Sequence, residues 1–168
     1  MLIEIIKLTP LYVWVLLAFL IQRGISTSQE REVNIPKSFL VPGIFIFWGL
    51  YTILSNFAHP YYALLFYAVF LCIGVYLGSK MYQNNYRFLV KNGTLFRAKN
   101  YLPLFIILVN FVIKYSLNIY MYIDPEAVNR VSFNVLYTSI SGTTVGLFFG
   151  GILVTYRYVT KQRGGLRG

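Results

Sequence analysis

The sequence predicts an all-α, polytopic membrane protein: a bundle of five transmembrane helices with the N-terminus outside and the C-terminus in the cytoplasm. Three observations carry this prediction. Hydrophobic residues make up 57% of the 168-residue chain and charged residues only 12%, whereas soluble domains contain about 25% charged residues. The apolar residues gather in long runs, and mean hydropathy is +0.61. The basic residues gather in alternate links between these runs.

Four hydrophobic runs are long enough to cross a hydrocarbon core of about 30 Å, which takes about 20 helical residues. The alternating pattern of a β-barrel is absent, so helices are the expected spanning form. A fifth run lies near the N-terminus, and together the runs place residues 1–168 in a single transmembrane domain. The predicted spans are residues 5–22, 39–57, 60–79, 101–123 and 133–156.

The first of these runs is less regular than the others. Thr9-Pro10 resembles a helix N-cap followed by proline at the first helical position. A helix from Pro10 to Gln22 is roughly 20 Å long at 1.5 Å per residue, which is too short to cross. Either residues 1–8 continue the helix through a proline kink, or they lie on the membrane surface. We favour the full, kinked span.

The basic residues predict the orientation, because positive loops stay on the cytoplasmic side. The opposite side carries only Lys7 and Arg130, and Lys114 lies within a span. We interpret the net charge of +10 as topology and lipid-headgroup anchoring, with no specific nucleic-acid partner. The basic residues on the predicted cytoplasmic side are Arg23, Arg31, Lys37, Lys80, Arg87, Lys91, Arg97, Lys99, Arg157, Lys161, Arg163 and Arg167.

The chain has a single cysteine, Cys72, and a single histidine, His59, and this excludes several kinds of redox and metal site. One cysteine cannot form an intrachain disulfide, a redox pair or a thiolate metal site. One histidine excludes a His-rich zinc site and haem held by two histidines of the chain. Since no acid–base, metal or cofactor set is evident, we expect a non-enzymatic protein with no cofactor and no metal.

Lys114 is the main candidate for a binding residue, because it lies near the middle of an apolar run. An ionised lysine at that depth costs roughly 2.5–3.5 kcal/mol on insertion scales. Asn110 and Asn118 lie four residues to either side, and therefore on the same helix face. These three residues predict a polar pocket that faces protein or a water-filled cavity.

The sequence leaves the partner of Lys114 open. Acids near the outer helix ends, backbone carbonyls near a proline, and a bound anion or lipid headgroup are the alternatives. The acids are Glu4, Asp124 and Glu126, and the prolines are Pro10 and Pro42.

Glycines recur every four residues in the last run, which predicts close helix packing. Gly142, Gly146 and Gly150 form this repeat, and Gly74 and Gly78 repeat it once in the third span. The helix that packs on them belongs either to the same chain or to a second copy in a homodimer.

Several short stretches follow one another along the chain in a characteristic order. They are T-P-L-Y-V-W-V-L-L from Thr9, L-V-P-G from Leu40, Y-L-P-L-F-I-I-L from Tyr101, I-K-Y around Lys114, and a glycine-rich last span that ends in basic residues. In this order they resemble a family of small, uncharacterised bacterial inner-membrane proteins and, more faintly, CcdC-like membrane proteins. The resemblance implies a bacterial cytoplasmic membrane and brings no activity. The family positions that the resemblance identifies in this chain are Thr9, Pro10, Trp14, Pro103, Lys114 and Tyr115, and it assigns no role to any of them.

Two functions are compatible with these features. The first is a non-enzymatic membrane component that self-associates or packs beside a partner membrane protein. The second is a small transporter or binder of an anionic or lipid-like molecule, with Lys114 as counter-charge. A tightly packed Lys114 favours the first function, and a Lys114 that lines a solvent-reachable cavity favours the second.

Overall fold

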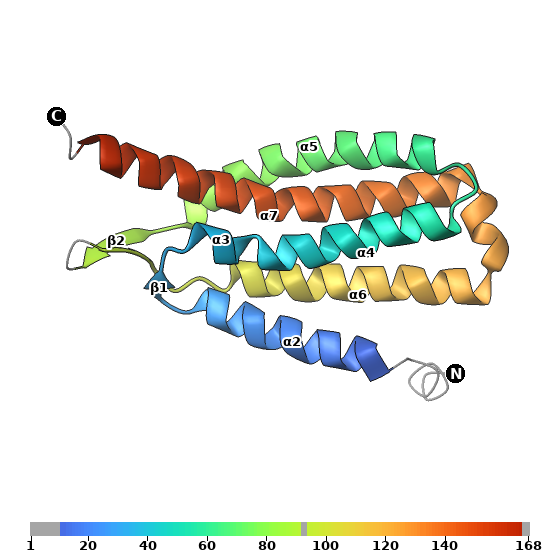
Figure 1. Cartoon of the computed structure of the whole chain (residues 1–168), viewed down its shortest axis with the longest axis horizontal. Coiled ribbons are helices and arrows are strands. Elements are labelled where there is room, and N and C mark those ends of the chain that lie inside the picture. Colours follow the sequence, from blue (N-terminus) through green and yellow to red (C-terminus); the bar gives the residue numbers. More distant parts are fainter. Residues whose placement is uncertain (1–10, 92–93, 166–168) are drawn as a thin grey trace.

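The computed structural model describes residues 11–91 and 94–165, which form a bundle of long helices with a small sheet at one end (Figure 1). The long helices are α2 (Leu11–Ser28), α4 (Leu40–Asn56), α5 (Pro60–Asn85), α6 (Leu102–Ile123) and α7 (Val131–Gly165). The shorter elements are β1 (Arg31–Glu32), α3 (Ile35–Ser38), β2 (Phe88–Lys91), β3 (Thr94–Arg97) and the 3-10 helix η1 (Pro125–Asn129).

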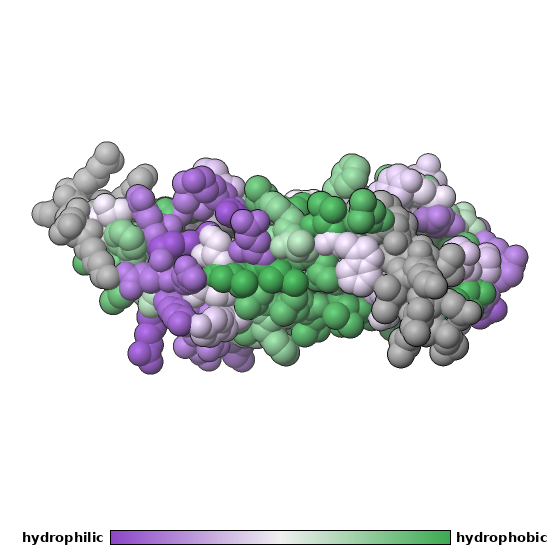
Figure 2. All heavy atoms as spheres, turned by 90° about the horizontal axis from the view of Figure 1, so that it is seen from below, coloured by the Kyte–Doolittle hydropathy of each residue, from purple (hydrophilic) through white to green (hydrophobic). Residues whose placement is uncertain are grey.

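Four helical segments are long and apolar enough to cross a membrane, which confirms the prediction of a helical chain with several helices capable of spanning. On the face seen in Figure 2, hydrophobic residues occupy the middle of the molecule and hydrophilic residues gather toward both ends. This is the surface that a bilayer requires of a spanning bundle. The four segments are Ile35–Asn56, Pro60–Asn85, Leu102–Ile123 and Val131–Lys161.

The first helix differs from its predicted bounds. α2 continues past Gln22 and ends at Ser28, whose hydroxyl donates to the carbonyl of Gly24 at 2.7 Å. The charge of Arg23 does not end the helix, because its guanidinium reaches the carbonyl of Lys37 at 2.9 Å. Residues 5–10 of the predicted span lie outside the described residues, and the described apolar part of α2 is shorter than a span.

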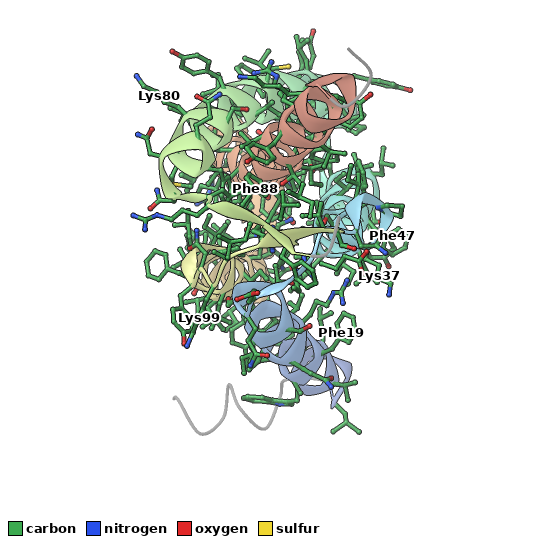
Figure 3. The ribbon with its side chains drawn as sticks, turned by 90° about the vertical axis from the view of Figure 1, so that its left-hand side faces the viewer. Phe19, Lys37, Phe47, Lys80, Phe88 and Lys99 are labelled. Atoms are coloured by element: carbon green, nitrogen blue, oxygen red, sulfur yellow. The ribbon has the colours of Figure 1, made fainter. Side chains whose placement is uncertain are left out.

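A three-stranded antiparallel sheet in the order β1-β3-β2 corrects the sequence analysis, which assigned only links to this part of the chain. Phe88 pairs with Arg97 between β2 and β3, and Arg31 pairs with Arg97 between β1 and β3. Figure 3 shows the β2–β3 hairpin lying across the end of the bundle, with Phe88 near its middle. The sheet therefore ties the link after α2 to the link after α5.

The predicted glycine faces pack helices of the same chain against each other. α5 and α7 make the most extensive helix contact in the described structure. A Cβ at Gly142 would lie 2.5 Å from the carbonyl oxygen of Tyr67, and one at Gly78 would lie 2.5 Å from that of Leu147. Any side chain would thus force the two backbones apart. The same holds for Gly74, Gly146 and Gly150.

The helix core consists of two clusters of buried apolar and aromatic residues. In the first, Phe45 stacks on Phe148 with ring centroids 6.0 Å apart. In the second, Phe57 meets Tyr137 edge to face at 5.4 Å. Lys114 contacts Phe45 of the first cluster and Tyr137 of the second, so it lies where the two clusters meet.

Candidate functional site

Lys114 is fully enclosed by the bundle, with none of its surface exposed. Its ammonium donates a hydrogen bond to the backbone carbonyl of Phe45 on α4 at 3.3 Å. The same nitrogen lies 5.9 Å from the ring centroid of Trp48 and 5.6 Å from that of Tyr137. Aromatic faces attract a cation at such distances. The lysine is therefore a packed residue, and it lines neither of the cavities described below.

Because Gly49 on α4 has no side chain, there is room beside it for the ammonium of Lys114. A Cβ at this position would lie 3.1 Å from Nζ of Lys114 and 3.6 Å from the hydroxyl of Tyr67 on α5. Four helices thus surround the charge: α4 with Phe45 and Gly49, α5 with Tyr67, α6 with Lys114 itself, and α7 with Tyr137.

The two predicted companions of Lys114 behave differently. Asn118 is half-buried, and its amide donates to the carbonyl of Lys114 in its own helix at 2.7 Å. Asn110 is fully buried, and neither its amide nitrogen nor its amide oxygen has a hydrogen-bond partner. Only Asn110 therefore keeps its polar atoms free for a ligand inside the bundle.

The acids that the sequence offered to Lys114 have other partners. Asp124 forms an ion pair with Arg130 at 2.9 Å, and Glu126 accepts from the amide of Asn129 at 2.8 Å. Glu4 and Pro10 lie outside the described residues. Among the described residues, the lysine's hydrogen-bond partner is the carbonyl of Phe45, one turn after Pro42 on α4.

A cavity at the basic end of the bundle was not predicted. It encloses about 40 Å³, and its wall draws on every long helix and on the sheet. Four basic residues line it, and no acidic residue is among its lining residues in the described part of the chain. The basic residues are Arg23 of α2, Arg31 of β1, Lys37 of α3 and Arg97 of β3.

Arg31 and Arg97 are direct cross-strand partners in the β1–β3 pair. Like charges directly opposite each other destabilise an antiparallel pair. Burial lowers the pKa of Arg31 to about 10, and the repulsion of Arg97 and then of Arg23 adds to this effect. The protein therefore holds two arginines together although Arg97 makes the charge of Arg31 less favourable.

Arg97 is held rigidly in spite of this repulsion. It is only 6% exposed. One guanidinium nitrogen donates to the hydroxyl of Tyr86 at 3.0 Å, and the other donates to the carbonyl of Thr27 at 2.8 Å. Its Nε has no hydrogen-bond partner although it is buried. Because burial raises the pKa of the Tyr86 hydroxyl, that hydroxyl stays neutral at physiological pH and cannot neutralise the arginine.

The inner wall of the cavity is apolar. Val41 and Pro42 of α4, Ile107 of α6 and Phe148 of α7 form part of it. The cavity therefore presents cations toward the basic end of the bundle and hydrocarbon toward the bundle interior.

A second hollow lies near the opposite end of the bundle, between the first turns of α5 and α7. Its wall is mostly apolar, with His59 at its edge and Tyr62 and Phe66 along α5. Asn134 of α7 lines it, and the buried amide oxygen of Asn134 has no hydrogen-bond partner. The hollow carries no charged residue, so it offers no recognition element comparable to the arginines.

Comparison with protein-family models, with curated proteins and with solved structures finds no match for this chain. The resemblance to a bacterial inner-membrane family therefore stays a prediction, and the function is argued from the chain's own residues.

Proposed function

We propose that this chain is a non-enzymatic, multi-pass protein of a bacterial cytoplasmic membrane that binds a phosphate-bearing amphiphile, such as an anionic phospholipid, in the arginine-lined cavity. In this proposal α2 is the fifth span, the N-terminus lies outside and the C-terminus lies in the cytoplasm. The direction of α2, antiparallel to α6 and with its C-terminus at the basic end, supports this topology (Figure 1).

The cross-strand pair of Arg31 and Arg97 carries the proposal. Two guanidinium groups opposite each other are unfavourable alone and favourable around a shared anion. The planar guanidinium matches phosphate through paired hydrogen bonds, better than the point charge of lysine does. With Arg23 and Lys37 on the same cavity, the site offers enough positive charge for a doubly charged group.

The location beside the bilayer favours an amphiphile as the ligand. Val41, Ile107 and Phe148 of the apolar wall are themselves packed in the first core cluster. The acyl chains of a bound lipid would therefore stay in the bilayer, outside the cavity. The enclosed volume of about 40 Å³ is below the range of about 300–1,000 Å³ typical of small-molecule sites, so only the phosphate group of a ligand would enter the cavity.

Two functions considered from the sequence used Lys114 as a counter-charge or the glycine face as a contact with a second protein, and the packing of these residues argues against both uses. Lys114 is enclosed, so it does not serve as the counter-charge of this cavity. The glycine face of α7 is covered by α5 of the same chain, so a homodimer or a partner protein would have to use another surface.

The test is binding of defined lipids to the purified protein, measured by native mass spectrometry. We expect adducts of phosphatidylglycerol, weaker adducts of zwitterionic phosphatidylcholine, and no competition by inorganic phosphate at equal concentration. Arg31→Gln should weaken phosphatidylglycerol binding at least about tenfold, since hydrogen bonds to charged groups contribute about 1.5–3 kcal/mol each. Competition by inorganic phosphate as strong as that by the lipid would instead identify a free-phosphate site.

Arg87→Gln is the matched control, because Arg87 is exposed at the same end and does not line the cavity. It should leave lipid binding unchanged. Arg31→Gln should also stabilise the ligand-free protein by about 1 kcal/mol, because it removes the Arg31–Arg97 repulsion at a partly exposed position. Equal losses in the two variants would show that only the overall positive charge matters, and the proposal would be wrong.

A further inference from the structure

The size of the arginine-lined cavity matches the end of a phosphate group. Its enclosed volume is about 40 Å³, and one water-sized group needs about 10–15 Å³ of such space, so the cavity holds roughly three groups of that size. A phosphate at the end of a molecule, a phosphomonoester, presents three terminal oxygens. A phosphate between two substituents, a phosphodiester, presents two and must lead a second substituent out through the mouth.

The charge of the cavity also favours a phosphomonoester. Each of its four basic residues comes from a different element, and no acidic residue is among the described residues that line it. A phosphomonoester carries a charge of about −1.5 to −2 at pH 7, whereas a phosphodiester carries a single negative charge. The site therefore stabilises the monoester through more charge as well as through one more acceptor oxygen.

The cavity has little freedom to enlarge for a headgroup. Its apolar floor belongs to the first core cluster, and close-packed protein interiors resist such expansion. Two hydrogen bonds hold the guanidinium of Arg97 in place on the side of the sheet. A headgroup on the far side of the phosphate would have to displace one of these walls. The floor residues are Val41, Ile107 and Phe148.

We propose that the ligand of the arginine-lined cavity is a phosphomonoester at the end of a membrane lipid, and that the cavity discriminates against phosphodiester lipids. This inference rests on the proposed function and narrows its class of ligand. Phosphatidylglycerol, a phosphodiester, is then a weaker ligand of the same site. Phosphatidic acid and polyprenyl monophosphates are the two kinds of lipid that carry the preferred group.

Native mass spectrometry with two matched lipids tests the preference on the wild-type protein. Dioleoyl phosphatidic acid and dioleoyl phosphatidylmethanol have the same acyl chains and differ by one methyl group on the phosphate. We expect phosphatidic acid to bind at least about tenfold more tightly, the effect of one further hydrogen bond between charged groups. Arg31→Gln should lower this ratio, since the loss of a cation weakens binding of the more charged lipid more. Arg87→Gln, exposed and outside the cavity, should leave it unchanged.

The pH dependence of binding is a second readout. The second ionisation of a phosphomonoester has a pKa near 6, so phosphatidic acid should bind more tightly at about pH 8 than at about pH 5. Phosphatidylmethanol keeps one charge and should bind equally at both. Arginine, lysine and tyrosine side chains titrate near 10 or above, so the change belongs to the lipid. The ionisable residues that line the cavity are Arg23, Arg31, Lys37, Tyr82, Tyr86 and Arg97.

The outcomes separate this inference from the proposed function. Equal binding of phosphatidic acid and phosphatidylmethanol would overturn the inference and leave the lipid site in place. No binding of either lipid, or of phosphatidylglycerol, would overturn the proposed function and the inference with it. An equal fall of the ratio in Arg31→Gln and Arg87→Gln would also overturn the inference, because general positive charge would then explain it. Between phosphatidic acid and a polyprenyl monophosphate, the tighter ligand identifies the source of the phosphate.

Discussion

The cations inside this protein are held in two opposite ways. Lys114 has aromatic rings and one carbonyl around it and no route to the exterior through a described cavity. Arg31 and Arg97 oppose each other at a cavity that opens at the basic end. Burial of a charge is unfavourable in both cases. Lys114 is thus sealed inside the bundle, whereas the arginines line a cavity that is open to the exterior.

Gly49→Ala measures how tightly the lysine site is packed. The new methyl group would lie 3.1 Å from Nζ of Lys114 and 3.4 Å from the ring of Tyr67, both buried. We expect Gly49→Ala to be about 1–3 kcal/mol less stable than Gly43→Ala, the cost of overpacking a core. Gly43 is on the same helix and has no atom within 4 Å of its ideal Cβ. Denaturant titration followed by tryptophan fluorescence gives both values.

Gly43→Ala should itself be neutral or stabilising by up to about 1 kcal/mol, because alanine favours a helix over glycine. Equal stability of the two variants would mean that the space around the ammonium is not confined.

At the scale of the helices, α5 and α7 act as one packed pair. Their glycines face backbone atoms of the partner helix, and backbone cannot rotate away as a side chain can. Without a hydrophobic driving force in lipid, such close van der Waals packing supplies much of the helix association. The four-residue glycine repeat made this contact predictable from the sequence. The sequence did not say that the partner helix belongs to the same chain.

Gly146→Ala tests this helix pair. Its methyl group would meet the carbonyl of Leu71 and the Cα of Gly74, so α5 and α7 would have to separate. We expect a loss of about 2–4 kcal/mol relative to Gly43→Ala, the range of severe steric substitutions. The same denaturant titration measures it. A loss below about 0.5 kcal/mol would contradict the close contact.

Sequence reasoning located the long helices better than it located the sites. Hydrophobic length and composition found the four helical segments capable of spanning, and helical spacing placed Asn110 on one face with Lys114. The arginine cavity was missed because Arg31 and Arg97 meet only through strand pairing. An Asn-Gly dipeptide at residues 92–93, between two apolar stretches, was an available hairpin signal. The partners Tyr67 and Tyr137 come from other helices, which no local pattern could indicate.

At the scale of the whole molecule, charge and apolar surface are separated along the bundle axis. Hydrophilic surface lies at both ends and hydrophobic surface lies between them (Figure 2). The basic links and the arginine-lined cavity occupy the end that also holds α3 and the sheet (Figure 3). This arrangement agrees with a cytoplasmic basic end, and it leaves the membrane orientation open to a direct test.

Cysteine labelling with a membrane-impermeant maleimide provides that test in bacterial cells that express the protein. In a Cys72→Ser background, His59→Cys should react in intact cells, because His59 is exposed at the proposed outer end. Lys161→Cys, exposed near the end of α7, should react only after the cells are lysed. The reverse pattern would invert the orientation, and labelling of both in intact cells would show that the probe crosses the membrane.

The two-residue strand β1 has a consequence for the order in which the protein is made. Within the sheet, β1 pairs with β3, and the carbonyl of Thr27 receives a hydrogen bond from Arg97, a partner 70 residues away. At about 5–20 residues per second, the ribosome needs roughly 4–14 s to supply that partner. During this interval α2 is already synthesised, but the contacts that fix its end do not exist. Closure of the sheet is therefore a late step of biogenesis, and the arginine-lined cavity can exist only after it.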